Sequence, residues 1–186
     1  MNSPNLSSDP HISILPFEGI EPQIHPTVFL CDGVRIVGDV SIGAHSSIWF
    51  NTVIRGDVHH IRIGEHTNVQ DLCMLHVTHK KYSLNIGSYV TVGHSAVLHG
   101  ATIHDTCLIG MGAKVLDRSI IGSNSIVAAG AVVREGFEVP EGVLVAGVPA
   151  KIIRPLKAEE IEQLTRQAAG YKSYVERYRA GGASAG

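Results

Sequence analysis

The sequence is poor in aromatic and charged residues, and both shortages restrict what kind of protein it can be. Of its 186 residues only 5% are aromatic and 17% are charged, while 44% are hydrophobic. So few aromatic side chains argue against a large globular core, and the hydrophobic content argues against intrinsic disorder. The length suits a single domain.

Three further shortages bear on partners and location. The net charge is only -2, which gives no electrostatic reason to expect nucleic acid or an anionic membrane as a partner. No apolar run approaches the roughly 18 residues of a membrane span. Residues 1–10 lack the basic-then-apolar order of a signal peptide, and three cysteines fit a reducing compartment better than a disulfide framework. We therefore expect a cytoplasmic protein.

What the sequence has in excess is β-branched aliphatic side chains. It contains 20 Val and 19 Ile against 12 Leu. Such residues fit the pleated surface of a sheet and lose rotamer freedom in a helix, so a mostly helical fold is excluded.

These aliphatic residues recur at every sixth position. The series restarts after each of two insertions and once resumes one residue early. The residue four positions after each aliphatic is small or short-branched in all but two hexads. Its members are Ile24, Leu30, Ile36, Ile42, Ile48, Ile54, Ile63, Val69, Leu75, Ile86, Val92, Leu98, Ile103, Ile109, Val115, Ile121, Val127 and Val133. Alternation of a large and a small residue is what a narrow interior requires, so the repeat predicts a solenoid.

This pattern resembles the hexapeptide-repeat family. The resemblance implies an all-β fold, a left-handed parallel β-helix of triangular section, in which 18 hexads make about six coils. Beyond Pro155, Ile161, Leu164, Ala168 and Tyr171 begin an apolar stripe with helical spacing. We predict a flexible tail over residues 1–15, the β-helix over 16–155, a C-terminal helix packed on it over 156–179, and a second tail over 180–186.

Two of the 11 histidines occupy equivalent places in the repeat. His76 and His99 each follow the aliphatic of a third hexad, on successive coils. Strand spacing places them about 4.8 Å apart, close enough to share one metal ion at Zn–N distances of about 2.0–2.1 Å.

His94 is the third candidate ligand. It lies one hexad before His99, on another side of the prism, so one subunit cannot close the site. If three prisms pack about a threefold axis, His94 of one chain can face the histidine pair of its neighbour. The same frame places Asp71 directly beneath His94 and Arg55 one coil from His76, and Asp57 could pair with Arg55 across the subunit boundary.

Three segments resemble the gamma-class carbonic anhydrases. They are NTVIRGD over 51–57, NVQD over 68–71 followed by His76, and GHSAVLHG over 93–100. The resemblance extends from about Phe17 to Tyr178. It implies a homotrimer that binds zinc, or iron or cobalt, at each interface through His76 and His99 of one subunit and His94 of the next. The reaction it implies is that of a lyase, the reversible hydration of CO2 to bicarbonate by metal-bound hydroxide.

The same resemblance implies roles for five further residues. Arg55 and Asp57 would anchor the interface, and Gln70 would orient the metal-bound solvent. Asp71 and Asn68 would support the site.

The proton-transfer step is where the chain departs from that family. The best-characterised enzymes of the family have a Glu next to the Asp57 counterpart and an acidic loop near the site, whereas this chain has Val58 and the short basic loop over residues 77–81. His79, His59 or His60 could accept the proton, since a His pKa near 6.5 suits the task.

Tyr171 is expected to pack rather than react. Two other functions stay open: a CoA-thioester hydrolase or acyltransferase on the same scaffold, and a non-catalytic assembly subunit fastened by the metal.

Overall fold

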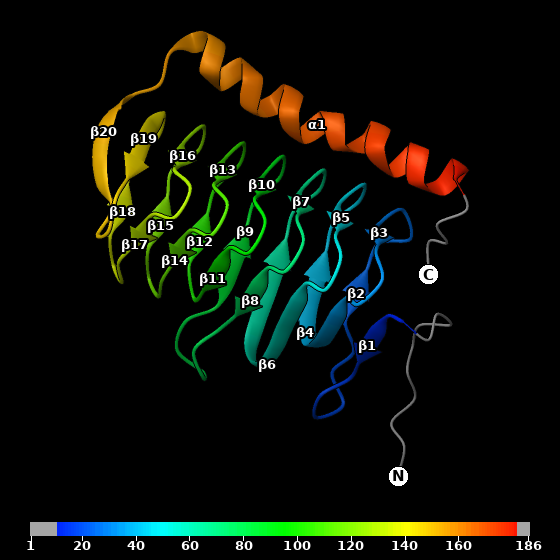
Figure 1. Cartoon of the computed structure of the whole chain (residues 1–186). Coiled ribbons are helices and arrows are strands. Elements are labelled where there is room, and N and C mark those ends of the chain that lie inside the picture. The colour runs from blue at the N-terminus through cyan, green and yellow to red at the C-terminus, as the bar shows by residue number, and fades with distance from the viewer. Residues whose placement is uncertain (1–10, 182–186) are drawn as a thin grey trace.

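The computed structural model describes residues 11–181 and forms a parallel β-solenoid of about seven turns with one C-terminal helix (Figure 1). Each turn contributes a stretch of strand to each of three faces, and most of these stretches are separate strands of two or three residues. The all-β hexapeptide-repeat fold expected from the sequence is therefore confirmed.

The helix face is covered by the C-terminal helix. Its strands are β3 (Phe29–Leu30), β5 (Ser47–Ile48), β7 (Asn68–Val69), β10 (Thr91–Val92), β13 (Leu108–Ile109), β16 (Ile126–Val127) and β19 (Val143–Ala146), all parallel, with β20 (Lys151–Pro155) antiparallel at the end.

The other two faces share the long strands β4 (Arg35–Ile42) and β6 (Val53–Ile63), each of which continues from one face onto the next. The histidine face holds their first halves with β1 (Ser13–Leu15), β8 (Met74–His76), β11 (Val97–His99), β14 (Lys114–Val115) and β17 (Val132–Val133). The third face holds their second halves with β2 (Gln23–Ile24), β9 (Leu84–Ile86), β12 (Thr102–Ile103), β15 (Ile120–Ile121) and β18 (Glu138–Val139).

The repeated aliphatic residues fill the interior of the solenoid. Leu75, Leu98 and Val115 lie in register on β8, β11 and β14 and are completely buried. Glycines allow the turns to approach one another: a Cβ atom on Gly64 would lie 2.6 Å from the backbone of Gly87 on the next turn. The hexad repeat thus fixes which residues face inward and which face out.

The solenoid ends at its expected limit, Pro155, but it begins earlier and has one turn more than expected. Val139 and Val145 continue the six-residue spacing and are buried, so they add strands beyond the 18 hexads. At the N-terminus, β1 pairs with β4 and Ile12 is completely buried, although we expected a flexible tail up to residue 15. The rest of that tail, residues 1–10, and residues 182–186 lie outside the described part of the chain.

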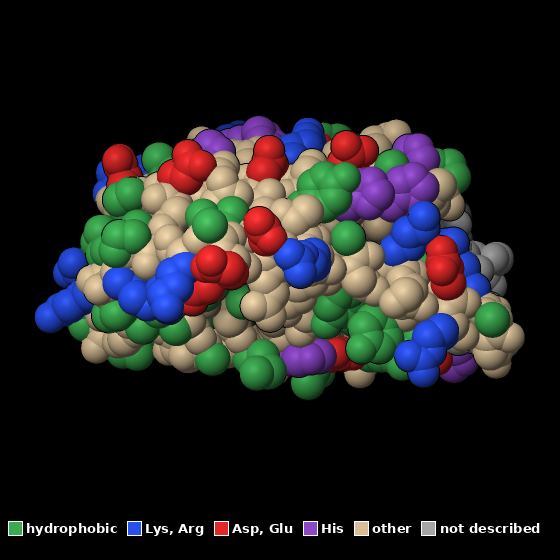
Figure 2. All heavy atoms as spheres, turned by 90° about the horizontal axis from the view of Figure 1, so that it is seen from above, with side chains coloured by type: hydrophobic (Ala, Val, Ile, Leu, Met, Phe, Trp, Pro, Cys, Tyr) green, Lys and Arg blue, Asp and Glu red, His purple; other side chains and the backbone are tan. Residues whose placement is uncertain are grey.

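Helix α1 (Ala158–Ala180) runs along the helix face, across the ends of its strands (Figure 1). The helix was expected over 156–179. Leu164 and Ala168 are its buried residues, and towards its C-terminus Tyr171 and Tyr178 contact the ring of Trp49. Seen from above, Lys and Arg side chains lie among those of Asp and Glu rather than in one broad patch (Figure 2). In the part of the chain that the structure describes, no helix is long and apolar enough to cross a membrane.

Candidate metal centre

The histidine pair forms as the repeat predicts. His76 on β8 and His99 on β11 are direct partners in adjacent parallel strands. Their ring centroids are 5.1 Å apart, and His76 Nδ1 lies 3.1 Å from His99 Nε2. Both side chains are partly buried, with exposed fractions of 17% for His76 and 33% for His99.

Each histidine of the pair has a carboxylate on its other ring nitrogen. Asp57 Oδ1 lies 3.1 Å from His76 Nε2, and Asp117 Oδ1 lies 2.6 Å from His99 Nδ1. Carboxylates in this position orient the imidazoles that bind metals and raise their basicity. The sequence prediction did not include Asp117. The column rule places Asp117 beside Gly100 on the next coil, one residue away from the position that matches His99, so the repeat indicated only its neighbourhood.

Arg55 pairs with Asp57 within one chain. We expected this pair to form across a subunit boundary. It forms locally because residues two apart on a strand point to the same side, and both belong to β6. Burial alone would raise the pKa of Asp57, but hydrogen bonds from Arg55 and His76 hold that pKa below its ordinary value. Asp57 is therefore ionised and available to orient His76.

The pKa of His76 lies below its ordinary value. Burial is the largest cause, and the hydrogen bond to Asp57 opposes it in part. Only the neutral imidazole binds a metal, so burial favours the form of His76 that can act as a ligand.

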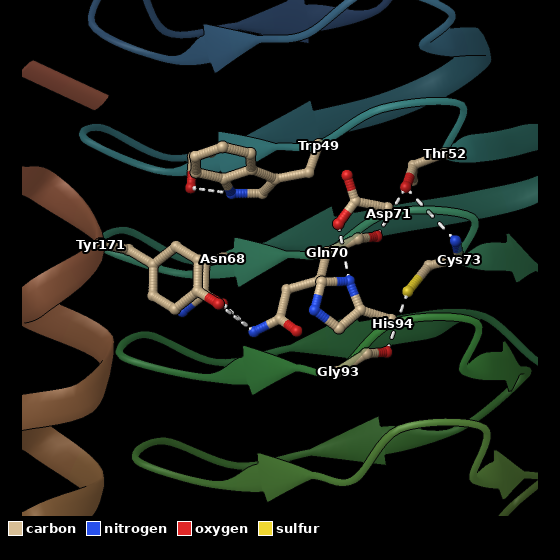
Figure 3. A network of polar contacts seen from close by, with 10 residues as sticks. Trp49, Thr52, Asn68, Gln70, Asp71, Cys73, Gly93, His94 and Tyr171 are labelled. Atoms are coloured by element: carbon tan, nitrogen blue, oxygen red, sulfur yellow. Dashed lines mark hydrogen bonds and ion pairs between the residues drawn. The ribbon is translucent and has the colours of Figure 1, made fainter. Parts of the chain in front are cut away.

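His94 lies at another corner of the solenoid, at the end of β10. Its side chain is 48% exposed, and its Nδ1 lies 2.6 Å from Asp71 Oδ2, which confirms the expected place of Asp71 (Figure 3). Within the described chain, no three His, Cys, Asp or Glu side chains are arranged to hold a metal ion together. The histidine pair and His94 thus belong to separate surfaces of one chain.

Two buried amide side chains near His94, those of Gln70 and Asn68, are hydrogen-bonded to each other, and Gln70 is also hydrogen-bonded to α1. Gln70 Nε2 lies 3.3 Å from Asn68 Oδ1 and donates a short hydrogen bond to the hydroxyl of Tyr171 (Figure 3). Asn68 Nδ2 donates to Thr91 Oγ1 at 2.9 Å. Burial raises the pKa of Tyr171, and Tyr174 and Asp71 act in the same direction. Tyr171, which we expected only to pack, also makes a polar contact with Gln70.

A cavity of about 520 Å³ opens between α1 and this corner. Aromatic and apolar surface dominates its lining, with a few polar groups, as is typical of binding pockets for small molecules. It is lined by Trp49, Phe50, Gln70, Asp71, His94, Gln167, Gly170, Tyr171, Tyr174 and Tyr178. The sequence did not predict this cavity, because it depends on where α1 docks.

A second cavity of about 260 Å³ lies on the side of Asp57. His59 and His79 line it together with Asp57, and the backbone N–H of Lys80 donates to the carbonyl of Val58 at 3.0 Å. This bond holds the loop between β8 and β9 against β6. His60, the third histidine considered for proton transfer, is not among the residues lining this cavity.

The cysteines are free and buried. Burial raises the pKa of Cys31, Cys73 and Cys107 to about 12 in each case. The reactive thiolate is therefore absent near neutral pH, so none of the three is suited to act as a nucleophile.

His76 and His99 fit two positions of a tetrahedral metal ion in their donor chemistry and spacing. Two nitrogens that bind zinc at 2.0–2.1 Å lie roughly 3.3 Å apart, and His76 Nδ1 and His99 Nε2 are 3.1 Å apart. The remaining nitrogens of the pair contact carboxylates, and His94 has Asp71 at its Nδ1. Two imidazoles do not complete a tetrahedral site, so a metal ion held here would need a further ligand from outside this pair.

Comparison with known proteins places the chain first in a fold class. Residues 100–135 match the family described as bacterial transferase hexapeptide (six repeats). The crystal structure of a hexapeptide transferase family protein from Anaplasma phagocytophilum superimposes with a TM-score of 0.84, at 40% identity over 88% of this chain and 96% of that one. The chain is thus a hexapeptide-repeat protein.

Within that class, the chain belongs to the gamma-class carbonic anhydrase family. It is 42% identical to the carbonic anhydrase of Geobacillus kaustophilus over 90% of this chain and 91% of that protein. It is 40% identical to gamma carbonic anhydrase 1, mitochondrial, of Arabidopsis thaliana over 86% of this chain, and spans only 60% of the length of that relative.

Proposed function

We propose that three copies of the chain assemble about a threefold axis and bind one metal ion at each interface. His76 and His99 of one subunit and His94 of the next would hold zinc, or iron or cobalt. The observation that carries this proposal is that all three histidines have a carboxylate partner, while within the described chain His94 does not form one group with His76 and His99.

The outward side chains of the histidine face support an assembly through that face. The helix face is covered by α1, and outward residues of the third face include Ser41, Arg62 and Thr102, as expected of a face in contact with water. On the histidine face five outward side chains are apolar and half-buried, although Arg35, Arg55 and Lys114 lie on the same face. The five are Val53, Met74, Val97, Leu116 and Val132. Two strongly exposed apolar side chains, Leu72 at 61% and Met111 at 59%, lie at the corner that carries His94.

The function we propose is the reversible hydration of CO2 to bicarbonate, the reaction of a lyase. A divalent ion bound by the three imidazoles would lower the pKa of a water molecule to about 7 and so would supply a nucleophile at neutral pH. Support comes from the relatives named as carbonic anhydrases.

The chain's own residues would hold this site in place. Asp57, itself held by Arg55, and Asp117 would orient His76 and His99, and Asp71 would orient His94. Gln70 is positioned by Tyr171 and Asn68 to direct an amide group towards solvent at the site. The apolar walls formed by Trp49 and the α1 tyrosines would limit access of water.

His79 is our candidate for carrying the proton away. It lines the cavity on the Asp57 side and is exposed, so it can exchange protons with buffer. We expect His79→Ala to lower kcat by about 10- to 100-fold and to leave kcat/KM unchanged, because His59 and buffer replace it only in part. Imidazole buffer should restore kcat in this variant. An equal fall in kcat and kcat/KM that imidazole does not restore would contradict the role.

The proposed reaction is tested by stopped-flow CO2 hydration with trimer of measured metal content. Hydration well above background in the metal-loaded sample, lost after chelation, is expected. A background rate with three metal ions per trimer would rule out the function. An acyl-CoA panel run on the same sample tests the alternative of a CoA-thioester hydrolase or acyltransferase, for which the 520 Å³ cavity and the likeness to a hexapeptide transferase are the support. Trimer that dissociates on chelation and turns over neither substrate would indicate the assembly role. The cytoplasmic location stays a prediction.

A further inference from the structure

Asp117 connects two parts of the chain that meet beside His99. It follows β14, and its side chain is 22% exposed. One carboxylate oxygen lies 2.6 Å from His99 Nδ1, and the other accepts a hydrogen bond from Thr78 Oγ1, also at 2.6 Å. Thr78 belongs to the loop between β8 and β9, where its backbone N–H donates to the carbonyl of Tyr82 at 3.0 Å.

The backbone around Asp117 is arranged so that its carboxylate can reach His99. A Cβ atom on Gly100 would lie 2.2 Å from Asp117 Oδ1, so only glycine leaves the space that the carboxylate occupies. Gly100 also has a φ of +56°, a conformation that other residues adopt at a cost. The carbonyl of Asp117 accepts from the N–H of Gly136 at 2.8 Å, which fixes the main chain at this point.

We propose that Asp117 is a positioning residue that fixes the tautomer and the ring orientation of His99. This inference rests on the proposed function, because it assigns His99 as a metal ligand. An ionised carboxylate only accepts hydrogen bonds, so the proton of neutral His99 lies on Nδ1. Nε2 is then bare and faces His76 Nδ1. Through Thr78, the same carboxylate sets the position of the loop that carries His79.

The chain offers a matched control in Asp105. Its carboxylate lies against Gly87 in the same way as the carboxylate of Asp117 lies against Gly100. A Cβ atom added to Gly87 would lie 2.3 Å from Asp105 Oδ1, and one added to Gly100 would lie 2.2 Å from Asp117 Oδ1. Asp105 accepts from the backbone N–H of Ser88 at 2.7 Å and contacts none of the three candidate ligands. Asp105→Ala therefore removes a carboxylate that packs against a glycine, as Asp117→Ala does, but leaves the candidate metal ligands and their partners unchanged.

Two measurements on full-length protein test the proposal. The first is the tautomer of His99 in metal-free protein, read from its imidazole nitrogen shifts by NMR. We expect the Nδ1–H form in the wild-type protein and in Asp105→Ala, and a rise of the Nε2–H form in Asp117→Ala. The second is zinc affinity by competition with a chromophoric chelator. Asp117→Ala should bind zinc 10- to 100-fold more weakly, and Asp117→Asn, whose amide oxygen still accepts, should recover part of the loss.

The outcomes separate this proposal from the proposed function. An unchanged His99 tautomer and unchanged zinc affinity in folded Asp117→Ala would overturn the role of Asp117. So would an equal loss in Asp105→Ala. Wild-type protein that binds no zinc would overturn the metal centre, while the tautomer measurement would still decide what Asp117 does. Far-UV circular dichroism and thermal unfolding of each variant exclude a general loss of fold as the cause.

Discussion

Replacing His94 by Ala is expected to abolish metal binding, although His94 belongs to a different surface of the chain from His76 and His99. Loss of a supporting partner of a metal ligand costs 10- to 100-fold in affinity or activity, so loss of a ligand itself should cost more than about 100-fold. Zinc content of the purified trimer and stopped-flow CO2 hydration measure the effect. The trimer of this variant should still form, because assembly takes place through the histidine face.

His104→Ala is the control for this variant. His104 is an exposed histidine outside both candidate surfaces, so its replacement should change neither zinc content nor rate. His94→Ala protein that keeps three zinc ions per trimer and full activity would show that the ion is held without a ligand from the neighbouring chain.

Placing a charge on the histidine face is expected to dissociate the trimer. Val97 is outward and half-buried on β11, next to His99. In Val97→Glu a carboxylate would be buried on assembly beside its strand partner Lys114, and taking charges out of water costs several kcal/mol per ion. The variant should run as a folded monomer, because the side chain points away from the solenoid core, and it should bind no metal at the interface. Light scattering during gel filtration reports the mass.

The comparison variant is Thr102→Glu on β12 of the third face, where the outward residues include polar side chains. It should stay trimeric and active. A trimeric Val97→Glu protein, or a trimer that dissociates equally in Thr102→Glu, would contradict assembly through the histidine face.

The six-residue repeat predicted the positions that matter most. Because the period fixes which residues of successive turns are neighbours, it placed His76 beside His99 and Asp71 beside His94 without any structure. The same period extends to Val139 and Val145, so the additional turn was also within reach of the sequence. The Arg55–Asp57 pair was misplaced, since we ignored that alternate residues of one strand share a side.

Other parts of the site could not be read from the repeat. The cavity beside His94 depends on the docking of α1 against Trp49, and helix periodicity gives the apolar stripe but not its place on the solenoid. The loop that carries His79 lies in an insertion, where the six-residue spacing is interrupted. Its position follows from the contacts of Lys80 with Val58 and of Thr78 with Asp117, which no periodic pattern encodes.

The most direct test of a site shared between subunits is to mix two inactive variants. His76→Ala and His94→Ala homotrimers should each lack metal and activity. Equal amounts of the two variants are unfolded together and refolded. A site is then intact at an interface where a His94→Ala chain supplies His76 and His99 and its neighbour, a His76→Ala chain, supplies His94. Random assembly of trimers makes this about one quarter of all sites, so about a quarter of the wild-type zinc content and CO2 hydration should return. No recovery from correctly refolded mixed trimers would contradict the account, because a site built within a single chain cannot be restored by mixing.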